Sequence, residues 1–211
     1  MLSSTLVILF SSGSGLDVFQ IPPHRQAVSV GGKQRQTPSI DINKMNIAFR
    51  QGTKHDLTEL KNLAIKSWGQ FQPRLTNDNW IKLYNSLTDD KTYTELLDKS
   101  NCVVCTFDKD KIIGMAFLVP NGNPTDIYDK EWSYIRFVSV DPDFGGQGIG
   151  RKLTTICIDT AKKNNEKSIA LHTSELMDKA RHIYESLGFT ILKEIDQRLG
   201  KRYWLYKLDL K

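Results

Sequence analysis

The chain has 211 residues, of which 39% are hydrophobic and 25% are charged, and its formal net charge is +5. This composition is typical of a globular protein with a buried core, and it excludes a collagen, a coiled coil and, with only three cysteines, a disulfide-rich toxin. The longest apolar run, Leu6 to Phe10, is too short to cross a membrane. The mild basic excess is far below that of a dedicated nucleic-acid-binding protein. We therefore expect neither a membrane nor a nucleic acid as a partner.

Residues 1–44 differ in composition from the rest of the sequence. They are rich in serine, and Asp17 is the only acid among the first 40 positions. We expect a flexible N-terminal tail. Two alternatives stay open: the serine-rich, acid-poor composition also suits an organellar transit peptide, and Met45 could be an internal start that follows an upstream extension. Residues 45–211 form the predicted folded domain, for which we expect a cytoplasmic location and a monomer or homodimer.

Strands and helices alternate from Met45 onward. Residues 45–50 are predicted to form a strand, and Thr53 with Asp56 resembles a capping box before an amphipathic helix. The later predicted elements are helices over 80–87 and 93–97, a hairpin over 102–107 and 112–119, a strand over 132–140, a helix from Ile149, a strand over 168–172, a helix over 177–187, and strands over 189–194 and 203–208. A hairpin followed by strand-helix-strand crossovers predicts a mixed α/β sheet.

The strand over 132–140 changes the phase of its apolar residues. Ile135 and Phe137 would lie on one face, whereas Val138 and Val140 would lie on the other. Because side chains of a strand alternate with a period of two, this slip predicts an inserted residue, a β-bulge, near Phe137 and Val138. A strand that is buried on both faces is the alternative. A bulge would free backbone donors and acceptors for a ligand.

A glycine-rich loop joins this strand to the following helix. Its sequence is Gly145-Gly146-Gln147-Gly148-Ile149-Gly150, and Arg151 and Lys152 follow it. Glycines let the backbone approach a ligand, and the helix start offers unpaired amides and the positive end of its dipole, so we expect a phosphate or pyrophosphate ligand. A Walker A loop is excluded because no hydroxyl residue follows Lys152, and the dinucleotide pattern fails because Arg151 stands where its last glycine belongs.

With these features the chain resembles the GNAT superfamily of N-acetyltransferases. The resemblance rests on Val140-Asp141-Pro142, on the glycine loop, and on a later motif, Ala180-x-x-x-Tyr184-x-x-x-Gly188-Phe189, and it covers about residues 45–211. It implies a GNAT-like acyl-CoA N-acyltransferase fold with a mixed, largely antiparallel central sheet and flanking helices. It also implies acetyl-CoA as co-substrate, with no metal.

The resemblance assigns cofactor contacts to three groups of residues. They are the strand residues Phe137, Val138, Ser139 and Val140 along the pantetheine; the loop and helix residues Gly145, Gly146, Gln147, Gly148, Ile149, Gly150, Arg151 and Lys152 around the pyrophosphate; and Met177 and Tyr184 further along the chain. Two positions depart from the family pattern. Gly145 replaces a glutamine or arginine, a contact for which Arg151 or Lys152 could substitute, and Met177 replaces a frequent asparagine.

Thioester aminolysis needs a deprotonated amine, a polarised carbonyl and a proton for the leaving thiolate. Tyr184 matches the family tyrosine beside the CoA sulfur and is the predicted general acid, with core packing as the alternative. The amide of Val138 is predicted to donate to the thioester carbonyl. Glu131 is the candidate base, although a solvated surface charge is equally compatible with its position. His172, at the end of a strand, is a further candidate for contact with the substrate.

We therefore predict an acetyl-CoA-dependent N-acetyltransferase that moves the acetyl group directly to an amine acceptor in a ternary complex. The alternative is a non-catalytic CoA-binding regulatory or scaffold protein. The acceptor is a small-molecule or peptide amine, and the acids Asp126, Asp129 and Glu131 would suit a cationic one. Cys102 and Cys105 are three residues apart in a strand, so they point to opposite faces and are predicted to be core thiols rather than a metal pair.

Overall fold

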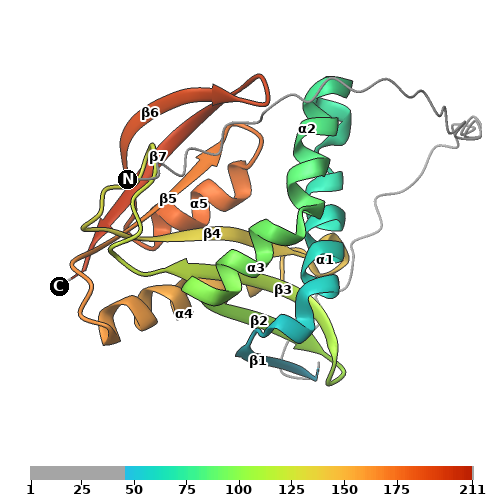
Figure 1. Cartoon of the computed structure of the whole chain (residues 1–211), viewed down its shortest axis with the longest axis horizontal. Helices are drawn as coiled ribbons and strands as arrows, with labels where there is room; N and C mark the ends of the chain where they lie inside the picture. Colours follow the sequence, from blue (N-terminus) through green and yellow to red (C-terminus); the bar gives the residue numbers. More distant parts are fainter. Residues whose placement is uncertain (1–45, 211) are drawn as a thin grey trace, which may run out of the picture. The chain divides into compact units, whose positions relative to one another are not determined.

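The computed structural model describes residues 46–210, and the predicted tail over residues 1–44 lies outside this range. The described residues form one seven-stranded sheet with the strand order β1-β2-β3-β4-β5-β7-β6 and with helices on both faces (Figure 1). All neighbouring strands run antiparallel except β4 and β5, which run parallel. The expected mixed, largely antiparallel α/β sheet with flanking helices is therefore confirmed.

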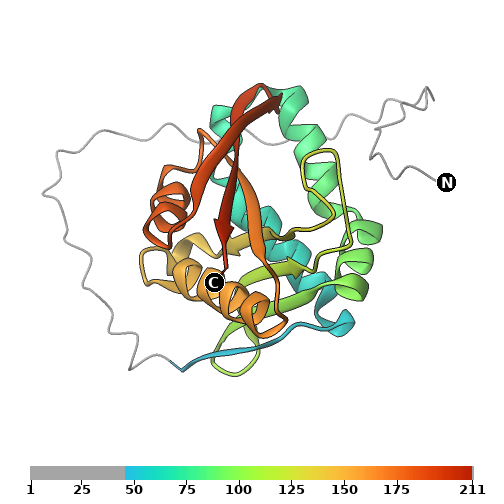
Figure 2. The ribbon, with the colours of Figure 1, turned by 90° about the vertical axis from the view of Figure 1, so that its left-hand side faces the viewer.

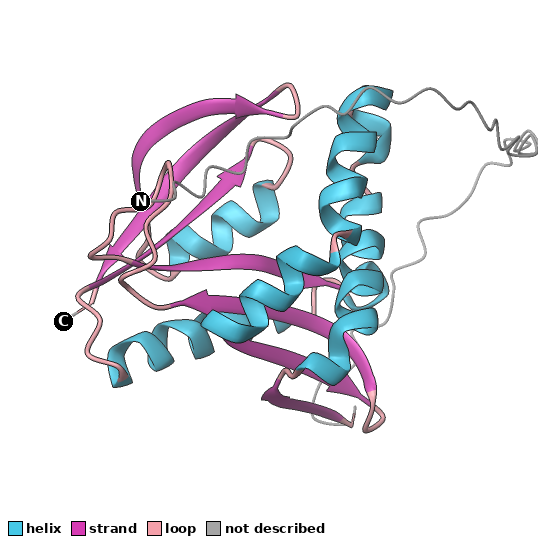
Figure 3. Ribbon diagram, in the orientation of Figure 1, coloured by secondary structure: helices cyan, strands magenta, loops and turns pink. Residues whose placement is uncertain are grey.

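The elements follow one another along the chain in the predicted order. Figure 3 shows where the helices and strands lie in the fold. The strands are β1 (Ile47–Gln51), β2 (Asn101–Phe107), β3 (Lys111–Val119), β4 (Ser133–Val140), β5 (Ser168–Ser174), β6 (Thr190–Arg198) and β7 (Lys201–Asp209). The helices are α1 (Leu57–Gly69), α2 (Asn77–Thr88), α3 (Asp90–Lys99), α4 (Ile149–Lys163) and α5 (Asp178–Ser186). The largest difference from prediction is at β6, which runs four residues further; most of this edge strand is exposed, so no apolar alternation marks where it ends.

The sheet separates two apolar cores. The turned view in Figure 2 shows helices on both sides of the sheet. We call the side covered by α1, α2 and α3 the α1–α3 face, and the side covered by α4 and α5 the α4–α5 face. Cys102 belongs to the core of the first face and Cys105 to the core of the second, which confirms that these thiols point in opposite directions. Burial raises the pKa of Cys105 to about 11, so this thiol is protonated in the core.

Strand β4 contains the predicted bulge. Between the pairs that Arg136 and Ser139 make with β3, a single β3 residue lies opposite both Phe137 and Val138. Phe137 has a φ of 52°, in the left-handed region that is uncommon for residues other than glycine. The expectation that Phe137 shares a face with Ile135 was wrong. The bulge turns the Phe137 ring to the α1–α3 core, whereas Ile135 and Val138 pack on the α4–α5 face.

Strands β4 and β5 are paired only at their beginnings. Ser133 pairs with Ile169 and Tyr134 with Ala170, after which the strands diverge (Figure 1). Residues 135–140 of β4 therefore have no strand partner on the side of β5. This divergence continues to the carboxyl end of β4, where the glycine loop begins.

Residues 46–210 contain neither a membrane-spanning helix nor a cluster of metal-binding side chains. No helix in this range is long and apolar enough to cross a bilayer. Over the same range, the side chains form no group of three or more histidine, cysteine, aspartate or glutamate residues that could hold a metal ion.

Candidate functional site

The loop between β4 and α4 has the backbone shape of an anion-binding site. Gly146 and Gly148 have φ values of 78° and 76°, and a Cβ at either position would meet nothing within 4 Å. Glycine is therefore required here by backbone conformation rather than by packing. Gly148 is the N-cap of α4, and its carbonyl accepts from the amide of Lys152 at 2.9 Å. The amides of residues 149–151 precede this first helical bond, so they have no intrahelical acceptor and are available to an anion.

Side chains add polar groups around these amides. Arg151 and Lys152 are both exposed in the first turn of α4, and Arg151 Nη1 donates to Ser186 Oγ of α5 at 2.6 Å. The Oε1 atom of Gln147 is buried and has no hydrogen-bond partner within residues 46–210. Such an unpartnered acceptor costs about 1–3 kcal/mol. A ligand group with an N–H or O–H donor would satisfy this acceptor, whereas the free amides of residues 149–151, with Arg151 and Lys152, fit a phosphate.

The chain segment before the loop is held by a lysine from α1. Lys66 Nζ lies 2.7 Å from Asp141 Oδ1 and 2.6 Å from Asp143 Oδ2, and the two hydrogen bonds raise the pKa of Lys66. The Asp141 side chain is 3% exposed and accepts from the amide of Asp143 at 3.0 Å. Lys111 of β3 lies 3.8 Å from the same carboxylate. These cations offset two acids that would otherwise repel an anion at the adjacent loop.

Lys66 is therefore a positioning residue, because it acts on the loop through Asp141 and Asp143 rather than by touching a ligand. This role of Lys66 was not predicted from the sequence. Lys66 and Asp143 are separated by 77 positions, and no local motif connects them.

Tyr184 lies on the α4–α5 face with Val138 and Val140, so the structure brings the predicted acid and the predicted β4 contacts into one core. Its side chain is 6% exposed, and its ring packs edge-on against Phe189 with 6.1 Å between centroids. Burial, with a smaller effect of Cys157, raises the pKa of the phenol. The hydroxyl is consequently protonated at neutral pH, as a general acid requires.

The remaining predicted site residues differ in their placement. Ser139 is buried, and its Oγ has no partner among the described residues. Met177 is the N-cap of α5 without a capping side chain, and its sulfur accepts from Thr173 Oγ1 at 3.5 Å. Gly145 is exposed and its amide donates to the carbonyl of Pro142 at 3.0 Å, which closes the turn before the loop.

Glu131 lies away from these groups. Its side chain is 64% exposed, and one carboxylate oxygen lies 4.0 Å from Lys130 Nζ. Glu131 precedes β4, whereas the glycine loop follows it, and the strand has eight residues. At about 3.3 Å per residue the two regions are roughly 25 Å apart along the strand. The structure does not bring Glu131 together with the loop.

A second polar cluster lies on the α1–α3 face of β4. Tyr128 Oη and His172 Nδ1 are 2.6 Å apart. Tyr128 also stacks on Tyr134, with 4.1 Å between centroids, and the His172 ring lies 6.0 Å from that of Tyr203. We call Tyr128, Tyr134, His172 and Tyr203 the His172 cluster. Its members come from β4, β5, β7 and the segment that precedes β4.

His172 is held neutral in this cluster. Burial is the main cause that lowers its pKa to about 3, and the positive charges of Arg198 and Arg136 lower it further. A neutral ring has one nitrogen acceptor, to which the Tyr128 hydroxyl can donate. Sequence analysis named His172 but missed Tyr128, because Tyr128 lies in a loop rich in glycine, proline and asparagine with no periodic pattern.

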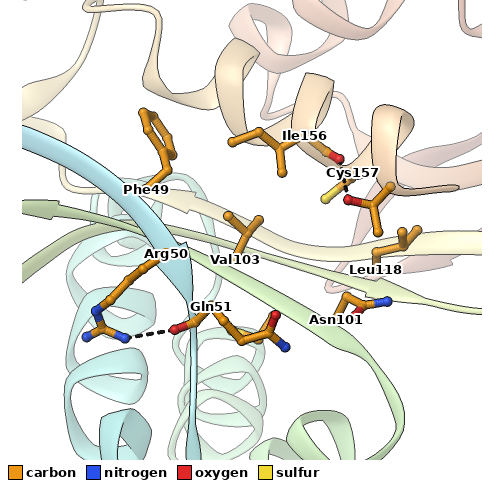
Figure 4. Close-up of a pocket in the computed structure, with 10 residues that line it drawn as sticks. Phe49, Arg50, Gln51, Asn101, Val103, Leu118, Ile156 and Cys157 are labelled. Carbon is orange, nitrogen blue, oxygen red and sulfur yellow. Dashed lines mark hydrogen bonds between the residues drawn. The ribbon is translucent and has the colours of Figure 1, made fainter. Parts of the chain in front are cut away.

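A cavity of about 270 Å³ lies elsewhere in the domain (Figure 4). It is bordered by the edge strand β1, by β2, and by the second half of α4, including Phe49, Val103 and Ile156. None of its lining residues belongs to the glycine loop, to the bulge or to the His172 cluster. The cavity therefore has no part in the candidate site.

Comparisons with known proteins agree with this geometry. The family described as "Acetyltransferase (GNAT) family" matches residues 59–189. Human N-acetyltransferase 8B is 28% identical over 127 residues, which are 60% of this chain and 52% of the relative. N-alpha-acetyltransferase 30 of Saccharomyces cerevisiae is 25% identical over 132 residues, 63% of this chain and 62% of that protein. The chain thus spans between half and two thirds of the length of these relatives.

Solved structures show the same fold. The PaiA N-acetyltransferase of Thermoplasma acidophilum, solved in complex with coenzyme A, superposes with a TM-score of 0.64 at 15% identity, covering 78% of this chain and 99% of that one. At this identity the likeness concerns the fold. The expected GNAT-like fold is confirmed.

Proposed function

Because the chain belongs to the GNAT family of acetyltransferases, we propose that it transfers the acetyl group of acetyl-CoA directly to an amine acceptor in a ternary complex. The observation that carries this proposal is the continuity of β4 with the loop. A bulge at Phe137 and Val138, a strand edge without a partner and a glycine loop with left-handed residues follow one another along one segment. A long ligand with a polyanionic end suits such a path.

The chain's own groups account for binding. Three or four hydrogen bonds from residues 149–151, Arg151 and Lys152 to a charged acceptor contribute about 1.5–3 kcal/mol each. Their sum is comparable with the roughly 8 kcal/mol that micromolar affinity requires. On the side of β5, where residues 135–140 have no partner strand, their backbone offers donors and acceptors to the amides of the pantetheine. Gln147 supplies a buried acceptor.

The chemistry of acetyl-CoA is that of an activated thioester, and the protein's task is to place charges and protons around it. The amide of Val138, beside the bulge, is the proposed donor to the thioester carbonyl. The protonated Tyr184 is the proposed source of the proton for the thiolate. Glu131 is the base expected from sequence, but roughly 20 Å of strand separates it from Val138, at about 3.3 Å per residue. A general base acts directly or through one water, so we propose no step for Glu131 in the transfer itself.

The test has two steps. First, acetyl-CoA should raise the melting temperature of the full chain far more than pyrophosphate at the same concentration. Second, free thiol should appear when the protein and acetyl-CoA are mixed with members of an amine library. Binding without thiol release from any amine would reject the enzymatic proposal in favour of a CoA-binding regulator. A failure of acetyl-CoA to raise the melting temperature would reject both.

A further inference from the structure

Arg136 is a partly buried cation without an anionic partner. It lies on β4 immediately before the bulge and is neither exposed nor fully buried. Within residues 46–210, two other arginines are partly buried, and each is paired with a carboxylate: Arg181 with Asp178 and Arg198 with Asp126. Arg136 makes no such pair in this range. Its Cζ lies 5.4 Å from the centre of the Phe137 ring.

A tyrosine with an unsatisfied hydroxyl packs against the same ring. Tyr93 of α3 is fully buried, its ring centroid is 5.3 Å from that of Phe137, and its hydroxyl has no partner among the described residues. Burial raises the pKa of Tyr93, and the positive charge of Arg136 opposes this rise. The Phe137 ring is therefore in contact with a guanidinium that has no carboxylate and with a tyrosine whose buried hydroxyl has no acceptor. Both are groups that an anion would satisfy.

Arg136 also acts electrostatically on the His172 cluster. Its charge lowers the pKa of His172 and opposes the burial that raises the pKa of Tyr134. Arg136 lies on β4 two residues beyond Tyr134, so both side chains project to the α1–α3 face. The cation thus adjoins both the bulge, where the acetyl group is proposed to lie, and the His172 cluster.

The acids that could attract a cationic acceptor are already engaged. Asp126 is held by Arg198 at 2.8 Å, and Asp129 Oδ1 accepts from the amide of Glu131 at 2.9 Å. Glu131 lies near Lys130 in solvent. The sequence-based suggestion that these three acids would suit a cationic acceptor therefore has no support in their contacts.

We infer that the acceptor carries a carboxylate a few bonds from its reactive amine, and that Arg136 binds this carboxylate. The inference rests on the proposed function. A guanidinium matches a carboxylate with two parallel hydrogen bonds, which would fix the amine relative to the bulge. Pairing with the guanidinium also offsets the charge of the carboxylate, which otherwise stabilises the protonated amine, and so favours the neutral, nucleophilic form. Two sources offer this chemistry: a free α-amino acid, and a peptide whose first residue is aspartate or glutamate.

Matched acceptor pairs test the inference and separate the two sources. L-leucine is compared with L-leucinamide, and Asp-Ala-Ala amide with Asn-Ala-Ala amide, by thiol release in the presence of acetyl-CoA. In at least one pair, we expect the acceptor with the carboxylate to have a kcat/KM at least tenfold higher than that of its amide counterpart. Arg136→Gln should reduce that preference below threefold, Arg136→Lys should keep part of it, and Arg74→Gln, an exposed arginine outside the cluster, should leave it unchanged.

Equal rates within both pairs, or an unchanged preference in Arg136→Gln, would overturn the inference. An unaltered melting temperature and an unaltered acetyl-CoA-induced shift show that the variant is folded. If no amine releases thiol, the proposed function fails. The role of Arg136 is then tested by calorimetry, which measures how tightly the same four compounds bind to the CoA-loaded protein. Tighter binding of a carboxylate than of its amide, lost in Arg136→Gln, would support the site. Equal or absent binding would overturn it.

Discussion

The glycine loop and the His172 cluster flank the same strand and are built in opposite ways. The loop is made of backbone groups from one short run of sequence, with Gly146 and Gly148 in the left-handed region. The His172 cluster is made of side chains from three strands and a loop, joined by stacking and by one hydrogen bond of 2.6 Å. A backbone site suits a ligand that is the same in every reaction of a family. A side-chain site can change with the acceptor while the fold stays the same.

The largest effect is expected from Gly148→Val. A β-branched residue at a φ of 76° is strained, so the loop should change shape and lose hydrogen bonds to the bound anion. We expect acetyl-CoA to bind at least tenfold more weakly, as measured by calorimetry. Gly122→Val is the matched control, because Gly122 has a φ of 81° and open space around it but lies outside the loop. Equal weakening in both variants would show that general backbone strain, rather than the loop, is responsible.

Tyr184→Phe tests the α4–α5 side of β4 without altering the loop. Removing one hydroxyl from a general acid lowers rates by about 10²–10⁴-fold. We expect kcat to fall by roughly 100-fold while the acetyl-CoA dissociation constant stays unchanged. Tyr206→Phe is the control, since that hydroxyl belongs to the same core but is engaged by Glu185 at 2.8 Å and by Arg181 at 3.3 Å. Unchanged turnover in Tyr184→Phe would assign this tyrosine to packing alone.

Lys66→Met should produce a smaller effect that is confined to the loop side. Asp141 and Asp143 would lose their shared cation, so the loop should be less well positioned and more repulsive to an anion. We expect KM for acetyl-CoA to rise about threefold to tenfold, an energy near 1 kcal/mol, with KM for the acceptor unchanged. Lys66→Arg should restore most of the affinity. Lys61→Met, on the same helix as Lys66, removes an ion pair with Asp90 of α3 and should not change KM; a similar rise there would indicate general destabilisation.

At neutral pH, the smallest effect is expected for His172→Gln, and it concerns the free energy of unfolding. The folded pKa of about 3 lies below the ordinary value of 6.5, so the unfolded chain binds the extra proton between these values. The contribution of the neutral ring is fully present above pH 6.5 and is lost as the pH falls toward 3. The wild-type free energy of unfolding should therefore fall more steeply over this window than that of the variant, by at most about 1.4 kcal/mol per pH unit. His182→Gln, at an exposed helix position, is the control and should follow the wild type.

The same contrast explains what could be predicted from sequence. Every strand and α-helix of residues 46–210 was expected, because hydrophobic periodicity and turn residues are local signals. The bulge was expected from the phase slip between Ile135 and Val138, and the loop from its glycines. The turning of Phe137 to the α1–α3 core was not, since the phase of a strand shows that a residue is inserted but not which one.

The contacts on the proposed acceptor side of β4 could not be predicted from sequence in this way. Tyr128 and His172 are 44 positions apart, and their contact depends on how a loop folds over β5. One usable signal was present: Arg136 is the single charge in an otherwise uncharged, largely buried strand, and such a charge is costly unless it has a partner or a ligand. The pairing of Asp126 with Arg198, across 72 positions, likewise removes an acid that the sequence presents as free.

A crystal structure of the chain with bound CoA tests the central claim most directly. We expect the pyrophosphate at the amides of residues 149–151, the pantetheine along residues 135–140 on the side of β5, and the sulfur beside Val138 and Tyr184. The α1–α3 face, with Arg136 and the His172 cluster, should stay free for the acceptor. Pyrophosphate bound elsewhere, or pantetheine lying over the His172 cluster, would contradict the division of β4 into a cofactor side and an acceptor side.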